Sequence, residues 1–168
     1  TVTLSRSGAG AREFVLVGGL VGTNPSNQAE LPALPLVTRG SLNISDNITF
    51  DPRGEDVTIG RSYTIGSGAS YNAYSNTTTF SGTTTGYIIF INAGATTKYF
   101  HNLNINNPGF TGTLSTSDIT IGNNLTILAG TFGTGDRTVT VRGDIFNSGT
   151  ITSTTGRVLI TQRGRVHT

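Results

Sequence analysis

The sequence predicts an all-β fold of short stacked strands, a β-solenoid or β-helix, with an immunoglobulin-like β-sandwich as the alternative. The first observation is a near-repeat of about twenty residues in the C-terminal third of the chain. Its matching apolar pairs are Ile119 and Ile121, Val139 and Val141, and Val158 and Ile160. The second is composition: Thr, Ser and Asn are abundant, 23 residues are Gly and 12% are charged, which suits half-exposed strands better than helices. A unit this short cannot bury its own apolar face, so we expect it to stack on neighbouring units or on another chain.

Residues 1–23 are expected to form an N-terminal apolar strand or arm. Positions 14–21 carry no charge, which fits either a strand buried on both faces or an arm that donates a strand to the next subunit. In the second case the self-associating side chains are Phe14, Val15, Leu16, Val17, Leu20 and Val21. Residues 24–35 hold three of the five prolines and predict a linker loop, which leaves 36–168 as a single β domain.

Alternating apolar and polar residues then predict strands within 42–50 and 57–65, separated by a turn at 51–56. We expect 66–85 to be a protruding loop or irregular coil with one short strand. Its aromatic residues, Tyr71, Tyr74 and Phe80, have the character of a sugar-stacking surface, although packing against the solenoid is the commoner fate of such rings. Further strands are expected at 86–91 and 99–105.

The last apolar positions lie close to residue 168 with no polar cap after them. Val158, Ile160 and Val166 are therefore expected to form an open strand edge, which invites another chain to pair with it.

Residues 99–164 run YFHNLNINNPGFTGTLSTSDITIGNNLTILAGTFGTGDRTVTVRGDIFNSGTITSTTGRVLITQRG. This stretch resembles the repeats of large secreted surface proteins and adhesins of Bacteroidetes-type bacteria. Those repeats open with aromatic-x-Asn-Leu-x-Ile and continue through a "GTf" and a "Gd…NsGt" element, in the same order as here. The resemblance implies a β-solenoid or similar stacked-strand segment at the cell surface, with adhesive or scaffolding roles, and raises the prospect that subunits stack end to end.

Charge and composition limit the classes of partner that the chain can have. A net charge of +2 and a pI near 9.3 come from basic residues spread along the chain, which argues against nucleic-acid binding. No apolar run is long enough for a membrane helix. The chain has no Cys, which excludes disulfides and thiolate metal sites. Low charge, Thr and Asn richness and the lack of Met favour a processed, extracellular or cell-surface protein.

Candidate chemistry is sparse, and we expect neither a cofactor nor enzymatic activity. The one tight acidic cluster, Asp51, Glu55 and Asp56, is a weak Ca²⁺ candidate whose simpler interpretation is a solvated turn. His101 and His167 have no Ser, Cys or acid at the spacing of a catalytic triad. A polysaccharide-active β-helix enzyme would need paired carboxylates in a groove; Asp136 and Asp144 sit on successive turns, where salt bridges to neighbouring arginines explain them equally well.

Two surface motifs have structural explanations. Arg142-Gly143-Asp144 matches the integrin-recognition tripeptide, but similar turns recur at Gly122-Asn123 and Arg163-Gly164. Asn43, Asn47, Asn76 and Asn124 each begin an N-x-Ser/Thr glycosylation sequon. Such matches arise by chance in a chain rich in Thr and Asn.

The sequence therefore predicts an extracellular structural subunit. It would associate through strand edges with copies of itself or with a larger surface protein, forming a filament or surface array. An adhesin or carbohydrate-binding module, with glycans as partners, is the alternative.

Overall fold

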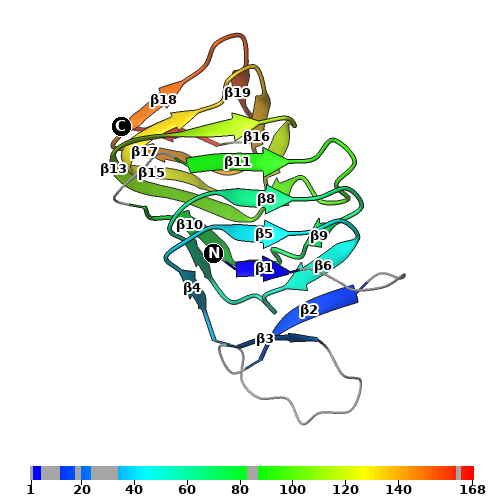
Figure 1. Ribbon diagram of the computed structural model, residues 1–168. Coiled ribbons are helices and arrows are strands. Elements are labelled where there is room, and N and C mark those ends of the chain that lie inside the picture. The colour runs from blue at the N-terminus through cyan, green and yellow to red at the C-terminus, as the bar shows by residue number, and fades with distance from the viewer. Residues whose placement is uncertain (1, 5–11, 18–19, 24–33, 83–86, 162–163) are drawn as a thin grey trace.

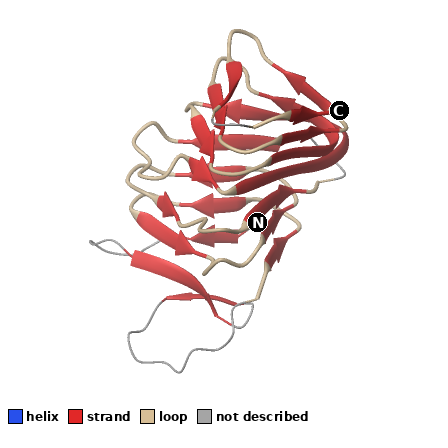
Figure 2. Ribbon diagram, turned by 180° about the vertical axis from the view of Figure 1, so that it is seen from behind, coloured by secondary structure: helices blue, strands red, loops and turns tan. Residues whose placement is uncertain are grey.

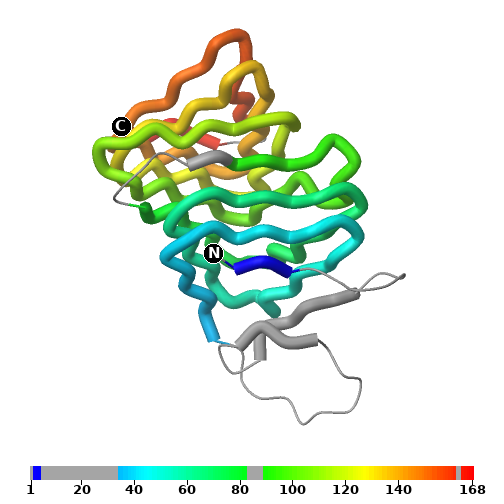
Figure 3. The backbone as a smooth tube through the Cα atoms, in the orientation of Figure 1, coloured from blue at the N-terminus to red at the C-terminus, as the bar shows by residue number. Residues whose placement is uncertain are grey.

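The computed structural model is a parallel β-solenoid, described at residues 2–4, 12–17, 20–23, 34–82, 87–161 and 164–168. Those residues contain strands and no α-helix. Successive coils of strands stack from the N-terminal part of the chain at one end to the C-terminal part at the other (Figures 1 and 3). The predicted solenoid is confirmed, and the alternative sandwich is not, because its sheets are antiparallel whereas nearly all strands here pair in parallel.

Each coil visits three faces in the same order (Figure 2). The first two faces belong to one 12-stranded sheet, and the third face consists of two four-stranded sheets. The first face contains β4 (Leu36–Thr38), β7 (Val57–Ile59), β10 (Thr77–Phe80), the starts of β13 (Asn102–Ser115) and β15 (Leu125–Gly133), β17 (Ile145–Asn147) and β20 (Val166–His167). The second contains β1 (Val2–Leu4), β5 (Leu42–Ile44), β8 (Tyr63–Ile65), β11 (Tyr87–Ile91), the ends of β13 and β15, and β18 (Thr150–Thr152). The third contains β2 (Arg12–Val17), β6 (Ile48–Asp51) and β9 (Ser70–Tyr71), then β12 (Tyr99–Phe100), β14 (Ile119–Ile121), β16 (Thr138–Val141) and β19 (Arg157–Ile160).

The strand register confirms the predicted repeat. Ile119 pairs with Val139 and Val139 with Val158, while Ile121, Val141 and Ile160 follow the same ladder two residues later. On the first face Leu125, Ile145 and Val166 form a second such ladder. Apolar residues at one register position therefore stack on each other down the axis of the solenoid.

The core includes an aromatic cluster, and one of its rings, Tyr71, was expected in a protruding loop. The rings of Phe50 and Tyr71 stack with centroids 5.8 Å apart, and Tyr63 lies 5.6 Å from Phe100. Tyr71 and Phe80 are buried, so the prediction of a protruding, sugar-stacking loop at 66–85 is wrong for them. This stretch instead contributes β9 and β10 to the stack. Tyr71 can be buried there because its hydroxyl forms a hydrogen bond inside the core, 2.9 Å from Thr78 Oγ1.

Aspartate and asparagine side chains join the coils at their corners. The pattern is constant: a side-chain oxygen accepts a hydrogen bond from a backbone N–H about one coil later in the chain. Its members are Asp46 with Ser67 (2.8 Å), Asp56 with Thr77 (2.7 Å), Asp118 with Thr138 (2.8 Å), Asn124 with Asp144 (2.9 Å) and Asp144 with Arg165 (2.7 Å). These bonds satisfy donors that the turn leaves without a strand partner.

The N-terminal segment pairs within its own chain. β2 runs parallel to β6, and β3 (Leu20–Thr23) lies antiparallel along the other edge of β2. The predicted arm residues Phe14 to Val21 belong to this pair of strands, except for 18–19, which lie outside the described residues, as does the predicted linker up to residue 33. Within this single chain the segment therefore forms internal strands, and donation of the arm to another subunit stays a prediction.

Candidate functional site

The C-terminal end of the solenoid is the candidate site, and we call β18, β19 and β20 the terminal coil. Each of these strands has one strand neighbour among the described residues: β15 for β18, β16 for β19 and β17 for β20. Their other edges carry backbone groups that no described strand pairs. Open parallel edges of this kind are templates for an added strand.

Inward-facing residues lose their cover at this end. Ile160 is 37% exposed, whereas Val141, its register partner one coil earlier, is fully buried. Val166 is 55% exposed and its partner Ile145 is 3% exposed. Ile151 and Val158 are partly buried and pack against the core. The three self-association residues predicted at this end thus occupy inward positions of the terminal coil, Val158 and Ile160 on β19 and Val166 on β20.

Further exposed side chains lie on the terminal coil and on the neighbouring strand β17. Leu159 and Phe146 are exposed apolar side chains. The His167 ring stacks on Phe146 with centroids 4.8 Å apart, and its Nε2 lies 3.3 Å from Asp144 Oδ2. The backbone N–H of Arg165, with a smaller contribution from His167, holds the pKa of Asp144 below its usual value. These contacts fasten β20 to β17.

The Arg142-Gly143-Asp144 tripeptide is a corner of the stack. Gly143 N–H donates to Asn123 O at 2.9 Å, and a Cβ at Gly143 would lie 2.6 Å from Asn124 Oδ1. Because Asp144 already accepts from Arg165 N–H of the next coil, the stacking of the coils accounts for Gly143 and Asp144, while Arg142 is exposed.

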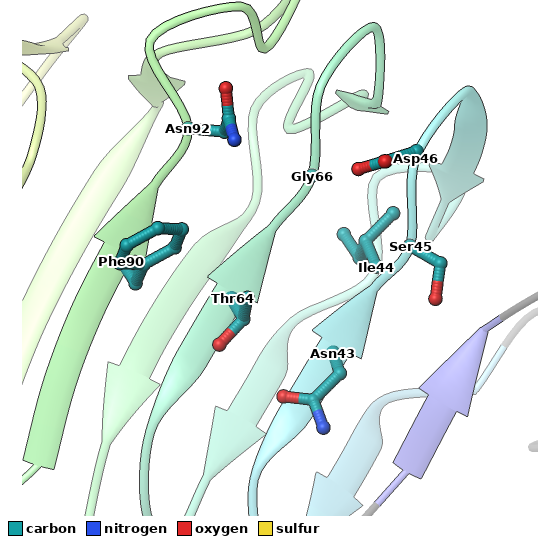
Figure 4. Close-up of a pocket in the computed structure, with 8 residues that line it drawn as sticks. All are labelled: Asn43, Ile44, Ser45, Asp46, Thr64, Gly66, Phe90 and Asn92. Carbon is teal, nitrogen blue, oxygen red and sulfur yellow. The ribbon is translucent and has the colours of Figure 1, made fainter.

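Apart from the terminal coil, the structure has a hollow of about 550 Å³ on the outer surface of the second face. Its floor is a row of three side chains in register on adjacent strands: Asn43 on β5, Thr64 on β8 and Phe90 on β11 (Figure 4). Asp46, Gly66 and Asn92 line its corner side. The sequence does not single out Phe90, because a continuous apolar run such as 86–91 does not show which residues face outward. In the structure the alternation of the strand places Ile89 and Ile91 inside and Phe90 outside.

The predicted Ca²⁺ candidates are not brought together. Asp51 Oδ1 accepts from Arg53 N–H at 2.6 Å and its Oδ2 from the Tyr74 hydroxyl at 3.0 Å, while Asp56 caps Thr77. Glu55 does not join them in a ligand set, since no group of three or more acidic, His or Cys side chains suited to a metal occurs in the described part of the chain.

The remaining polar candidates are also dispersed. His101 Nδ1 lies 3.1 Å from the Tyr99 hydroxyl, far along the chain from His167, and Asp136 accepts from Thr155 Oγ1. Three hollows are lined by one carboxylate each: Asp46, Asp51 or Asp144. None of the three therefore brings together the carboxylate pair of a glycosidase.

The four sequon asparagines differ in access. Asn47 is exposed, and Asn43 and Asn124 are partly exposed. Asn76 is buried, and its Nδ2 donates to Glu55 O at 3.0 Å and to the Tyr71 hydroxyl at 2.8 Å. A glycan cannot reach Asn76 in the folded chain.

Among the described residues, no helix is long and apolar enough to cross a membrane. No family model, curated protein or solved structure matches this chain.

Proposed function

We propose that this chain is a structural β-solenoid subunit that associates with copies of itself through the terminal coil, within an extracellular filament or surface array. The observation that carries the proposal is that the terminal coil keeps the inward apolar pattern of the interior coils while Ile160 and Val166 stay exposed. An added strand layer would cover these side chains and pair the open edges.

Two forces would act in this contact. Burial of the exposed apolar surface supplies most of the affinity, at about 25 cal/mol per Å² before ordering costs. Backbone hydrogen bonds along the open edges supply direction and register. The extracellular location is supported by composition alone, the low charge and the absence of Cys and Met.

Sedimentation velocity across a range of protein concentrations tests the proposal. We expect the wild-type chain to associate as concentration rises and Ile160→Lys to remain monomeric, because a buried unpaired charge opposes the contact. Leu128→Lys is the control, since Leu128 is also an exposed apolar residue (50% against 37% for Ile160) but lies on β15, away from the open end. A wild-type chain that stays monomeric at every concentration would show that the proposal is wrong.

The row of Asn43, Thr64 and Phe90 favours a second candidate, glycan binding. A partly exposed aromatic ring beside amide, hydroxyl and carboxylate groups suits a sugar, whose faces stack on rings while its hydroxyls form hydrogen bonds. A glycan array probed with the wild-type chain, Phe90→Ala and Tyr74→Ala tests it. Binding lost only in Phe90→Ala supports this hollow; loss only in Tyr74→Ala would move the site to the hollow beside Asp51.

A further inference from the structure

The two ends of the stack differ in how their apolar interior is covered. At the N-terminal end Leu4 and Leu36, inward residues of β1 and β4, are 4% and 8% exposed, and β3 lies along the outer edge of β2. At the other end Ile160 and Val166 are uncovered. β1 and β4 also have one strand neighbour each, but their inward residues are covered. Among the described strands, inward apolar residues are thus left uncovered at the C-terminal end, and a self-complementary patch closes into a two-fold pair.

We infer that the terminal coils of two copies meet end to end about a two-fold axis, with their strands antiparallel. This inference rests on the proposed self-association and specifies its partner, a second copy in the opposite orientation. Three observations on the terminal coil carry it: the direction of its free backbone groups, the order of its strands along the axis and the placement of its charges.

On the third face, β19 would pair with β19 of the second copy. Arg157 N–H donates to Arg137 O and Thr161 N–H to Val141 O, at 3.2 and 2.8 Å. By alternation, the N–H and C=O of Val158 and Ile160 point to the open edge. When Val158 pairs with Ile160 of the second copy, the N–H of each residue donates to the C=O of the other. The inward side chains stay inward in this pairing. Leu159 then lies opposite its own copy, on the two-fold axis.

On the other two faces, β18 of one copy would pair with β20 of the other. Thr134 N–H donates to Thr152 O and Ile145 N–H to Arg165 O, at 2.8 and 2.7 Å. The free edge groups are therefore those of Ile151 and Val166, and both side chains face inward, since their register partners Phe132 and Ile145 are buried. The two-fold axis brings Ile151 opposite Val166, so the uncovered apolar residues cover each other.

The rise of the coil allows all three contacts at once. The chain passes β18, β19 and β20 in this order as it climbs, so β19 lies between the other two along the axis. Suppose the two-fold axis places β19 about 4.8 Å, one strand spacing, from β19 of the other copy. Because β18 lies as far below β19 as β20 lies above it, β18 is then the same distance from β20 of the other copy. The strands of all three faces then continue across the junction.

The charges of the terminal coil fit this register. Arg157 falls opposite Thr161, Arg165 opposite Thr152, and His167 opposite Thr150, so no like charges stand directly opposite each other. Residues 136–168 nevertheless contain five arginines and two aspartates. Two such ends repel weakly at a distance, and added salt is expected to strengthen the dimer by screening this repulsion.

Disulfide trapping tests the register, because the chain has no cysteine of its own. Leu159→Cys would face its copy as a non-hydrogen-bonded antiparallel pair with Cα atoms about 4.5 Å apart, within reach of a disulfide. Arg157→Cys is the control on the same strand, about 13 Å from its copy. With diamide as oxidant, we expect the cross-linked fraction to be at least about ten-fold higher for Leu159→Cys.

The outcomes separate the inference from the proposed function. A covalent dimer that forms with Leu159→Cys and not with Arg157→Cys supports the two-fold pair. If the wild-type chain associates but neither variant is trapped, or both are trapped equally, self-association stands and the two-fold register is wrong. Filaments in electron micrographs without Leu159→Cys trapping would favour head-to-tail stacking. A chain that is monomeric throughout contradicts both ideas.

Discussion

Val141 on β16 and Ile160 on β19 occupy the same register position in neighbouring coils, yet only Val141 is buried. The same contrast separates Ile145 from Val166 on the first face. The residue types match, so burial in this fold depends on whether a further coil follows. Stability should accordingly be a sum of coil and neighbour contributions, and the terminal coil should be the weakest part of an isolated subunit.

The largest expected effect comes from truncating one apolar residue in each kind of coil. Ile121→Ala removes a fully buried side chain and should lower the free energy of unfolding by about 2–5 kcal/mol. Ile160→Ala, in the partly uncovered position, should cost no more than about 1 kcal/mol at low protein concentration. Urea denaturation measures both.

Protein concentration sharpens this test. If the terminal coil becomes buried by association, the penalty of Ile160→Ala should grow as protein concentration rises, while that of Ile121→Ala stays constant. Equal penalties at low concentration would contradict the difference between the coils.

Alkaline pH should weaken the interior through its buried tyrosines. Burial raises the pKa of Tyr71 from 10.0 to about 12, and burial also raises the pKa of Tyr63. The unfolded chain therefore loses these protons first, so stability is intact below pH 10 and falls as pH rises above it, by up to about 1.4 kcal/mol per pH unit for each tyrosine. Urea midpoints at rising pH measure the slope.

A variant of Tyr63 tests how much of this pH dependence comes from each tyrosine. Tyr63→Phe should flatten it by about half if the two tyrosines contribute alike. The terminal coil contains no tyrosine, so its amide exchange should show no separate step in this range. An unchanged slope in the variant would exclude Tyr63 as a source.

A smaller effect is expected at the corners. Asp118→Ala removes the acceptor of Thr138 N–H and should lower the free energy of unfolding by about 0.5–1.5 kcal/mol. Asp144→Ala removes the acceptor of Arg165 N–H at the last corner, where only β20 follows. It should speed amide exchange at Ile145, whose N–H donates to Arg165 O, with little change in global stability. A global loss as large as that of Asp118→Ala would mean that β20 is as tightly coupled as an interior strand.

The smallest effect is the acid titration of Asp144. Its pKa is lowered from 3.8, first by the Arg165 N–H bond, so its contribution is present above pH 3.8 and fades as pH falls through the lowered value. The protection factor of the Ile145 amide should fall only in that acid range. A fall that begins in the neutral range would exclude Asp144 as its source.

The sequence predicted the regular part of the fold because alternation is explicit there. Ile119, Val139 and Val158 are all apolar, so their ladder can be found by matching segments. It failed at 66–85, where Thr78 takes an inward position that an apolar residue usually fills. The Thr78 hydroxyl forms a hydrogen bond with the Tyr71 hydroxyl inside the core. A prediction that depends on the alternation of apolar and polar residues cannot identify a buried polar pair of this kind.

The candidate site was predictable only where it depends on alternation along one strand. Val158, Ile160 and Val166 followed from their own strands. The stack of Phe146 with His167 requires knowing that residues 21 apart in the chain lie side by side. The same offset links many of the corner bonds, and combining it with the repeat would have revealed the stack.

The corner bonds also have a direction. In each, the oxygen belongs to the earlier coil and the N–H to the later one, so a finished coil already holds the acceptor that its successor needs. Such a chain can wind up progressively while it leaves the ribosome, N-terminal residues first, with every completed turn acting as the template for the next.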